Sequence, residues 1–385
     1  MKYFIVAGEA SGDLHASNLM ASIKQKDPEA DFCFLGGDLM QAQGGKMIRH
    51  YRNMAFMGII PVLMNLKTVL GNMKSCTDAI KEYSPDVVIL VDYPSFNLKI
   101  ARFVKENLKD VPVFYYIAPK LWAWKEYRLK QIKKYVDRVF SILPFEVEWF
   151  GERGYKVDYV GNPCMDAVQN MKHKNEPMSD FLQRNNLENK PIIAILPGSR
   201  MQEITGSLPK MVEAASEFKE YQIVVSGAPA IDKKVYSELL TWHNAKVVYN
   251  ETYELLQQAT AAVVVSGTAA LEAALIGTPQ VVVYQMNGGK LFHEFLKLFI
   301  KVPYVSLANL IAKRWMIKEL IIEDFTVENM KREITELLKK EKQEEMKKDY
   351  QWLRDTLGYD SVSDKAATLM LDALQKKMLS ANAQK

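Results

Sequence analysis

Short apolar runs alternate with longer amphipathic stretches along the first half of the chain. The runs are rich in Val, Ile and Phe, and apolar residues recur at helical spacing in the segments between them. This alternation is typical of βαβ units, which build a parallel sheet covered by helices. The pattern predicts strands at residues 4–6, 32–35, 87–91, 113–117 and 139–143.

The same alternation begins again after a polar stretch. Residues 170–190 are charged and contain Pro177, which predicts an interdomain linker with a short surface helix. Beyond them the pattern predicts strands at residues 192–196, 223–225, 262–265 and 281–284. We therefore expect one α/β domain at residues 1–168 and a second at residues 169–354.

The chain is predicted to be helical and is heavily charged from Val327 onward. The last amphipathic stretch, residues 364–379, carries an apolar stripe that must cover another surface. The stripe consists of Ala367, Met370, Leu371 and Leu374. We predict that residues 355–385 cross back and pack on the first domain.

The composition narrows the class of protein. A chain of 385 residues with 48% hydrophobic and 25% charged residues suits two globular domains, and a net charge of +4 does not favour nucleic acid as the main partner. Three widely spaced cysteines predict neither a disulfide framework nor a thiolate metal site. The first apolar run is too short for a signal sequence, and no run reaches the roughly 18 residues of a spanning helix. We expect a cytoplasmic protein with at most peripheral membrane contact.

Two acidic residues stand at predicted strand ends, where parallel α/β folds bind ligands. Glu9 lies in the loop 8–13 (GEASGD), which lacks dinucleotide-binding spacing and which we interpret as an acceptor or sugar loop. The alternative is a tight turn in which Ser11 or Asp13 caps a helix. Asp92 ends the strand 87–91 and could accept a proton from an attacking hydroxyl, or it could merely cap the next helix.

The first turn of the second domain suits a diphosphate. Gly198, Ser199 and Arg200 follow the strand 192–196. Glycine lets backbone amides face an anion, and arginine offers a forked, permanently charged set of donors. The alternative is an ordinary turn with a surface arginine.

A second turn in this domain also predicts an anion site. Ser266, Gly267 and Thr268 precede a helix whose unpaired amides and dipole favour a pyrophosphate leaving group. Glu272 lies about one turn further and could accept hydrogen bonds from ribose hydroxyls. The alternative is a helix of small residues packed closely on its sheet.

Two stretches are amphiphilic in a way typical of interfacial anchors for anionic lipid. Residues 56–66 are apolar and include Met57, Ile60 and Leu63. Trp122 and Trp124 stand in a segment with basic residues, namely Lys120, Lys125, Arg128, Lys130, Lys133 and Lys134. The alternative is that these side chains belong to the core.

The sequence contains no motif for metal binding or for phosphoryl transfer. The five histidines show no ligand spacing, and the chain has no Walker P-loop. We therefore expect no metal site and no cofactor, with any sugar nucleotide acting as a substrate.

Taken together, the motifs resemble the lipid A disaccharide synthase family of GT-B glycosyltransferases, along nearly the whole chain. The residues that carry the resemblance are 8–13 (GEASGD), Met57-Gly58, 92–97 (DYPSFN), Pro119, 122–124 (WAW), 143–146 (LPFE), 196–200 (LPGSR), 266–272 (SGTAALE), 304–307 (YVSL) and Asn309-Leu310.

The resemblance implies a GT-B fold, in which two Rossmann-like domains face a central cleft. It implies transfer of 2,3-diacylglucosamine from its UDP derivative to 2,3-diacylglucosamine 1-phosphate (lipid X), at the cytoplasmic surface of the inner membrane. The acid that matches Asp92 is essential in such enzymes, and no metal is needed. UDP is expected to contact Arg200, Ser266, Gly267, Thr268, Glu272 and Asn309.

Two positions depart from the family pattern. Asn162 stands where many relatives have a histidine, and Ser95 stands where several have a second acid. We therefore expect Asp92 to act as the base in an inverting displacement, with Glu9 as a second candidate catalytic residue.

Two other functions remain open from the sequence. One is a UDP-N-acetylglucosamine 2-epimerase of the same fold, and the other is a nucleotide-binding regulator without catalysis. The sequence does not fix the oligomeric state, and a homodimer is one option.

Overall fold

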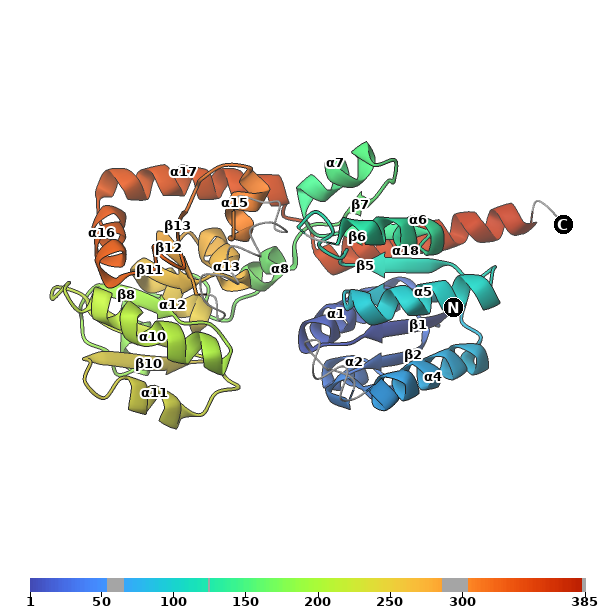
Figure 1. Cartoon of the computed structure of the whole chain (residues 1–385), viewed down its shortest axis with the longest axis horizontal. Helices are drawn as coiled ribbons and strands as arrows, with labels where there is room; N and C mark the ends of the chain where they lie inside the picture. The colour runs from blue at the N-terminus through green and yellow to red at the C-terminus, as the bar shows by residue number, and fades with distance from the viewer. Residues whose placement is uncertain (54–65, 124, 286–303, 383–385) are drawn as a thin grey trace. The chain divides into compact units, whose positions relative to one another are not determined.

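The chain forms two compact units. The structure is a computed structural model that describes residues 1–53, 66–123, 125–285 and 304–382 (Figure 1). One unit comprises Met1–Pro163 with Asp360–Lys385, and the other comprises Cys164–Tyr359. The boundaries between the units, after Pro163 and after Tyr359, lie near the boundaries expected after residues 168 and 354. Four residues predicted to contact a membrane or acyl chains lie outside the described residues, namely Met57, Ile60, Leu63 and Trp124.

The first unit is built on a parallel sheet with the strand order β3-β2-β1-β4-β5-β6-β7. Its strands are β1 Lys2–Ala7, β2 Asp31–Gly36, β3 Lys46–His50, β4 Val87–Val91, β5 Val113–Tyr116, β6 Arg138–Ser141 and β7 Asp158–Tyr159. Its helices are α1 Ala10–Lys26, α2 Asp38–Ala42, α4 Leu66–Tyr83, α5 Pro94–Asn107, α6 Leu129–Tyr135, α7 Pro144–Glu152 and α18 Val362–Asn382, with short 3₁₀ turns η1 Tyr51–Asn53 and η2 Glu126–Arg128.

Helices cover both faces of this sheet. All residues of β4 are buried, which explains why the central strands read as continuous apolar runs. The C-terminal helix α18 returns to this unit and packs on α1 (Figure 1). Its Ala367, Met370 and Leu371 join the core cluster that contains Ile5 of β1, so the apolar stripe covers the first unit.

The second unit repeats the plan with the strand order β10-β9-β8-β11-β12-β13. Its strands are β8 Ile192–Leu196, β9 Gln222–Gly227, β10 Ala245–Tyr249, β11 Ala259–Val265, β12 Gln280–Tyr284 and β13 Lys318–Ile321. Its helices are α8 Pro163–Gln169, α9 Met178–Arg184, α10 Met201–Ala215, α11 Lys233–Leu239, α12 Thr252–Gln258, α13 Thr268–Ile276, α15 Leu307–Ala312, α16 Val327–Leu337 and α17 Lys340–Leu357.

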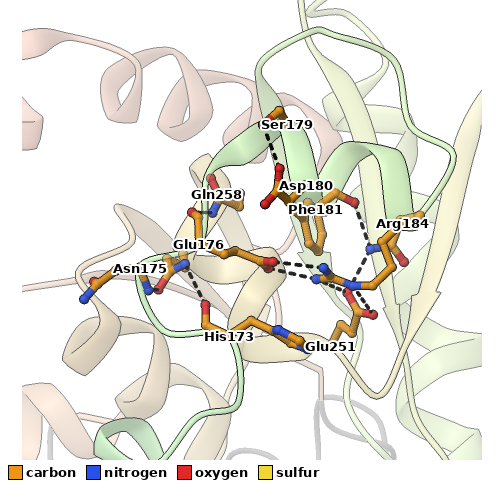
Figure 2. A network of polar contacts seen from close by, with 11 residues as sticks. His173, Asn175, Glu176, Ser179, Asp180, Phe181, Arg184, Glu251 and Gln258 are labelled. Carbon is orange, nitrogen blue, oxygen red and sulfur yellow. Dashed lines mark hydrogen bonds and ion pairs between the residues drawn. The ribbon is translucent and has the colours of Figure 1, made fainter.

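Residues 170–190 are part of the second unit, so the predicted linker is wrong, whereas the short surface helix predicted in this range is present as α9. The guanidinium of Arg184 pairs with Glu176 at 2.8 Å and with Glu251 at 2.9 Å (Figure 2). The charges that resembled a solvated linker are thus used to fasten α9 to the start of α12. The same contacts fix Glu251 just before Thr252 and Tyr253.

In each sheet, two neighbouring strands mark the point where the order of connection reverses. These pairs are β1 with β4 in the first unit and β8 with β11 in the second. Loops that follow such strands open onto a crevice at the carboxyl edge of the sheet, where α/β proteins bind ligands. Both candidate carboxylates and both candidate anion turns follow these four strands. No described helix is long and apolar enough to cross a membrane.

Candidate functional site

Glu9 and Asp92 follow adjacent strands of the first unit. Ala7 pairs with Val91 at the carboxyl ends of β1 and β4, so the two loops leave the sheet side by side. Asp92 and Tyr93 both have left-handed backbone conformations, with φ of 45° and 46°. Two successive non-glycine residues in this region store strain, which is typical of functional sites.

The backbone around Asp92 is held by buried side chains. The Asp92 carbonyl accepts hydrogen bonds from Asn97 Nδ2 at 2.7 Å and from the Tyr115 hydroxyl at 2.5 Å. Asn97 and Tyr115 are both fully buried. The N-cap of α5 is Tyr93, so the alternative that Asp92 caps this helix is wrong.

Burial raises the pKa of the Asp92 carboxyl, while the nearby Lys120 ammonium and the Tyr93 backbone N–H act to lower it. A raised pKa makes a carboxylate more basic, as a proton acceptor requires. Asp92 as a whole residue keeps partial exposure to solvent, although burial dominates the environment of its carboxyl.

The two acids of the GEASGD loop, Glu9 and Asp13, have different roles. Glu9 occupies the N-cap position of α1 but makes no side-chain capping bond. Asp13 is buried and accepts hydrogen bonds from the backbone N–H groups of Gly37, Leu39 and Met40 at 2.7–3.1 Å, which caps α2. The capping alternative therefore holds for Asp13, although the helix that it caps is α2. Glu9 remains the candidate for chemistry in this loop.

The second unit contains a cavity of about 450 Å³ at the carboxyl edge of its sheet. It is enclosed by the loops after β8, β9 and β11 and by the first turn of α12. The lining includes the predicted Gly198, Ser199, Arg200, Ser266, Gly267, Thr268 and Glu272. Two turns that are far apart in the sequence thus meet in one cavity of the size that small ligands occupy.

The turn after β8 depends on Gly198 but does not present free amides. Gly198 has φ of +97°, and a Cβ there would lie 2.5 Å from Glu203 Oε2. The backbone N–H groups of Ser199 and Arg200 donate to that same carboxylate oxygen at 3.0 and 3.3 Å. The expectation that these amides face an anion is therefore wrong, because Glu203 already occupies them. The Arg200 side chain is 71% exposed, and its guanidinium forms an ion pair with Glu203 Oε1 at 3.3 Å, so a phosphate would share Arg200 with this carboxylate.

The turn after β11 provides a helix start and an acid. Gly267 is the N-cap of α13 and has no side chain to cap it, and Gly267, Thr268 and Ala269 line the cavity, so the positive end of this helix lies beside it. Glu272 Oε1 accepts a hydrogen bond from the Tyr253 hydroxyl at 2.8 Å. Burial raises the pKa of Glu272, and the bond from Tyr253 lowers it.

Three further polar residues line the cavity and were missed from the sequence. Ser226 Oγ and Thr252 Oγ1 lie 2.6 Å apart, and Tyr253 follows Thr252 directly. Ser226 lies at the end of β9 and Thr252 begins α12 after β10. These residues could have been predicted from their positions at strand ends, because in a parallel sheet every strand is followed by a loop at the carboxyl edge.

Asn309 does not line the cavity, and the prediction that it contacts the nucleotide is wrong. Its side chain is fully buried, its Nδ2 donates to the Ile317 carbonyl and Glu319 Oε1, and its Oδ1 accepts from the N–H groups of Met316 and Ile317. Glu319 also accepts from the N–H of Val305, whose carbonyl accepts from Ser266 Oγ at 3.3 Å. Asn309 is therefore linked to the cavity residue Ser266 through Glu319 and Val305, and acts as a structural residue.

The predicted membrane contact of Trp122 is also wrong. Trp122 is 8% exposed, donates from Nε1 to Glu146 Oε1 at 2.9 Å and packs against Phe145. Ser141 Oγ donates to the other oxygen of Glu146.

Among the residues that the structure describes, no group of three or more His, Cys, Asp or Glu could hold a metal ion.

Two parallel-sheet units with ligand loops at their carboxyl edges define the GT-B fold. Solved structures share it along nearly the whole chain. A UDP-GlcNAc 2-epimerase from Neisseria meningitidis bound to UDP-GlcNAc aligns with a TM-score of 0.65 at 15% identity over 98% of this chain and 100% of its own. The glycotransferase of kitacinnamycin aligns with a TM-score of 0.65 at 14% identity over 97% of this chain and 99% of its own. Identities this low establish the fold alone.

Sequence relatives identify the family. The family model described as lipid-A-disaccharide synthetase matches residues 3–372. The lipid-A-disaccharide synthases of Myxococcus xanthus and Syntrophus aciditrophicus are 37% and 35% identical to the chain, each over 97% of both sequences. The chain therefore belongs to the lipid-A-disaccharide synthetase family and is a glycosyltransferase. The epimerase alternative is not favoured, because its support is confined to the fold.

Proposed function

We propose that the chain transfers 2,3-diacylglucosamine from its UDP derivative to the 6-hydroxyl of 2,3-diacylglucosamine 1-phosphate, forming a β-1,6-linked disaccharide 1-phosphate and UDP. The observation that carries the proposal is the family match along residues 3–372. The cavity of the second unit and the acidic edge of the first supply the two chemistries that this reaction needs, which are binding of a diphosphate and activation of a hydroxyl.

The proposed mechanism is a single displacement with inversion at the anomeric carbon. Asp92 accepts the proton of the 6-hydroxyl as its oxygen bonds to the anomeric carbon, while the bond from that carbon to the UDP oxygen breaks. The transition state has oxocarbenium character, so a second carboxylate at the same edge, Glu9, stabilises the positive charge. Arg200 and the first amides of α13 stabilise the negative charge that develops on UDP.

In this proposal no metal ion takes part. Arg200 and the start of α13 provide the positive charge that a divalent cation supplies to diphosphates in other enzymes. Turnover is expected to be unchanged after dialysis against excess EDTA. Loss of turnover that returns on addition of Mg²⁺ or Mn²⁺ would contradict this part of the proposal.

We further propose that the enzyme works at the cytoplasmic surface of the inner membrane, because both substrates carry acyl chains. Lys130, Lys133 and Lys134 are exposed on α6, and Tyr127 just before it is 64% exposed. Basic side chains beside an exposed aromatic ring favour binding to anionic lipid.

Co-sedimentation with phosphatidylglycerol vesicles tests the membrane proposal. A variant with Lys130, Lys133 and Lys134 changed to Glu should lose most of its vesicle binding. Lys109, an exposed residue of the α5–β5 loop, provides a control through Lys109→Glu. Equal sedimentation of both variants would rule out this surface.

Mass spectrometry of the products tests the reaction itself. Incubation with UDP-2,3-diacylglucosamine and 2,3-diacylglucosamine 1-phosphate in detergent should yield the disaccharide 1-phosphate and UDP in equal amounts. Conversion of UDP-N-acetylglucosamine to its 2-epimer would support the epimerase instead. UDP binding without any turnover would support a regulator.

A further inference from the structure

Two basic side chains lie at the same sheet edge as Asp92. Lys120 follows β5, the strand beside β4, and Arg128 ends the turn η2. Arg128 Nη2 donates a hydrogen bond to Ser95 Oγ at 3.0 Å, and Ser95 lies in the first turn of α5, three residues after Asp92. Lys120 is near enough to Asp92 and Glu146 for its charge to lower the pKa of both carboxyls.

Lys120 and Arg128, like Lys130, Lys133 and Lys134 of α6, form no ion pair in the described part of the chain, whereas several other basic residues of the first unit do. Arg153 forms an ion pair with Glu126, Arg138 with Asp158, and Lys105 with Asp137. Within the described part of the chain, neither Lys120 nor Arg128 forms an ion pair with any acid. The edge that carries Asp92 therefore presents Arg128, which bonds the neutral Ser95 hydroxyl, and Lys120, whose charge acts on Asp92 and Glu146 without a direct ion pair.

We propose that Lys120 and Arg128, with the Ser95 hydroxyl, bind the phosphate of the acceptor sugar beside Asp92. This inference rests on the proposed function, since it takes the acceptor to be a sugar 1-phosphate. A phosphate monoester carries up to two negative charges and matches the fork of a guanidinium, while an ammonium adds a point charge. Ser95 Oγ accepts from Arg128 and so has its own proton free to donate to a phosphate oxygen.

The geometry suits the acceptor rather than the donor. The 1-phosphate and the reacting 6-hydroxyl are carried by C1 and by the C6 group of C5, the two carbons that flank the ring oxygen, so the phosphate must lie beside the base and not on it. Ser95 lies in the first turn of α5, three residues after Asp92, and Arg128 is bonded to it, so both lie beside Asp92. The donor has no phosphate monoester, and its diphosphate has its own cavity in the second unit. Lys120 and Arg128 would thus bind the acceptor sugar in preference to the donor sugar.

Phosphate groups of membrane lipids offer the same chemistry, so the experiment must separate the two sources. We would measure initial rates of the full-length enzyme in neutral-detergent micelles without anionic lipid. The acceptors are 2,3-diacylglucosamine 1-phosphate and its 1-O-methyl analogue, which lacks the phosphate. The variants are Lys120→Gln and Arg128→Gln, and Lys109→Gln removes the same charge at the opposite edge of the sheet as a control.

Wild type should prefer the phosphorylated acceptor. Each variant should raise the KM for that acceptor about tenfold or more, leave the KM for the UDP-sugar unchanged and act on the methyl analogue as wild type does. Lys109→Gln should discriminate as wild type does. Arg128→Lys, which keeps the charge and loses the fork, should fall between Arg128→Gln and wild type.

Unchanged discrimination in Lys120→Gln and Arg128→Gln would overturn the phosphate site, and so would an equal loss with both acceptors. A variant that loses binding to phosphatidylglycerol vesicles but still discriminates would assign these cations to the membrane surface. Absence of disaccharide from the wild-type enzyme with either acceptor would contradict the proposed function instead.

Discussion

Asp92 owes its position to its backbone rather than to its carboxylate. Asn97 and Tyr115 bind its carbonyl, and both are fully buried, so side chains of the core hold the strained conformation through the backbone. A carboxylate left available in a fixed orientation is what proton transfer requires, because a base must lie within hydrogen-bonding reach of the proton that it accepts.

Asp92→Asn should lower kcat by about 10² to 10⁴-fold, the usual contribution of a general base, and leave UDP affinity unchanged. Asparagine keeps the shape of the side chain but cannot accept the proton. Steady-state rates and calorimetric titration with UDP measure the two effects. Asp110→Asn, on an exposed loop at the opposite edge of the sheet, is the matched control. Wild-type turnover in Asp92→Asn would exclude it as the base.

Glu146 predicts a pH dependence of stability. Burial raises its pKa from 4.5 to about 7, against the bonds from Ser141 and Trp122. A carboxyl whose pKa is raised by folding favours the folded state while it is protonated. Its contribution is complete below the unfolded pKa and is lost as the pH rises through about 7.

The variant Glu146→Gln should abolish this dependence, because an amide can satisfy Ser141 and Trp122 without a charge. Its unfolding free energy should exceed that of wild type by up to about 3 kcal/mol at pH 8 and should differ little at pH 4. Urea denaturation at the two pH values provides the measurement. An equal difference at both values would mean that Glu146 is not the titrating group.

The roles of Trp122 and Asn309 could not be predicted from the sequence, because each depends on its hydrogen-bond partners in the fold. A tryptophan among lysines is compatible both with a lipid surface and with the interior. Only the fold reveals that Glu146 is placed to accept its Nε1–H. Asn309 lies in a matching motif, but its amide is fully used by Ile317, Glu319 and Met316, and no sequence pattern reports such pairing.

At the scale of elements, the inner strands were predictable because parallel strands covered on both faces are continuously apolar. The edge strands β3, β7, β10 and β13 were not predicted, because their residues are not continuously buried. Every predicted run became a strand, and both acidic loops and both anion turns follow the strands at which the order reverses. Residues 170–190 were misassigned because their charges pair with a partner distant in sequence, as Arg184 does with Glu251. Contacts of this kind are set by the fold and leave no local pattern.

Asn309 ties helix α15 to strand β13, so Asn309→Ala should act on stability. It leaves buried backbone groups of Met316 and Ile317 without partners, which should cost about 2 kcal/mol or more. Chemical denaturation should show this loss, while the UDP affinity of the folded fraction changes little. Asn170→Ala removes one exposed amide contact and should cost under about 0.5 kcal/mol. A selective loss of UDP binding in Asn309→Ala would restore it as a ligand residue.

At the scale of the whole molecule, the second unit is continuous in sequence and contains all the residues of its cavity. A fragment of residues 164–359 should therefore fold alone and bind UDP with an affinity close to that of the full chain, but show no transfer. Calorimetry measures the binding, and Arg200→Gln in the same fragment should weaken it. A folded fragment without UDP affinity would mean that the cavity is not the nucleotide site.

The first unit, in contrast, needs both ends of the chain. Its core cluster joins Ile5 and Leu19 to Val362 and Met370. A ribosome must therefore finish the entire second unit before the last pieces of the first become available. The second unit can complete its folding first, whereas the N-terminal strands wait with an uncovered apolar face. Nascent chains released early would expose that face, which makes this half the one more dependent on chaperones during synthesis.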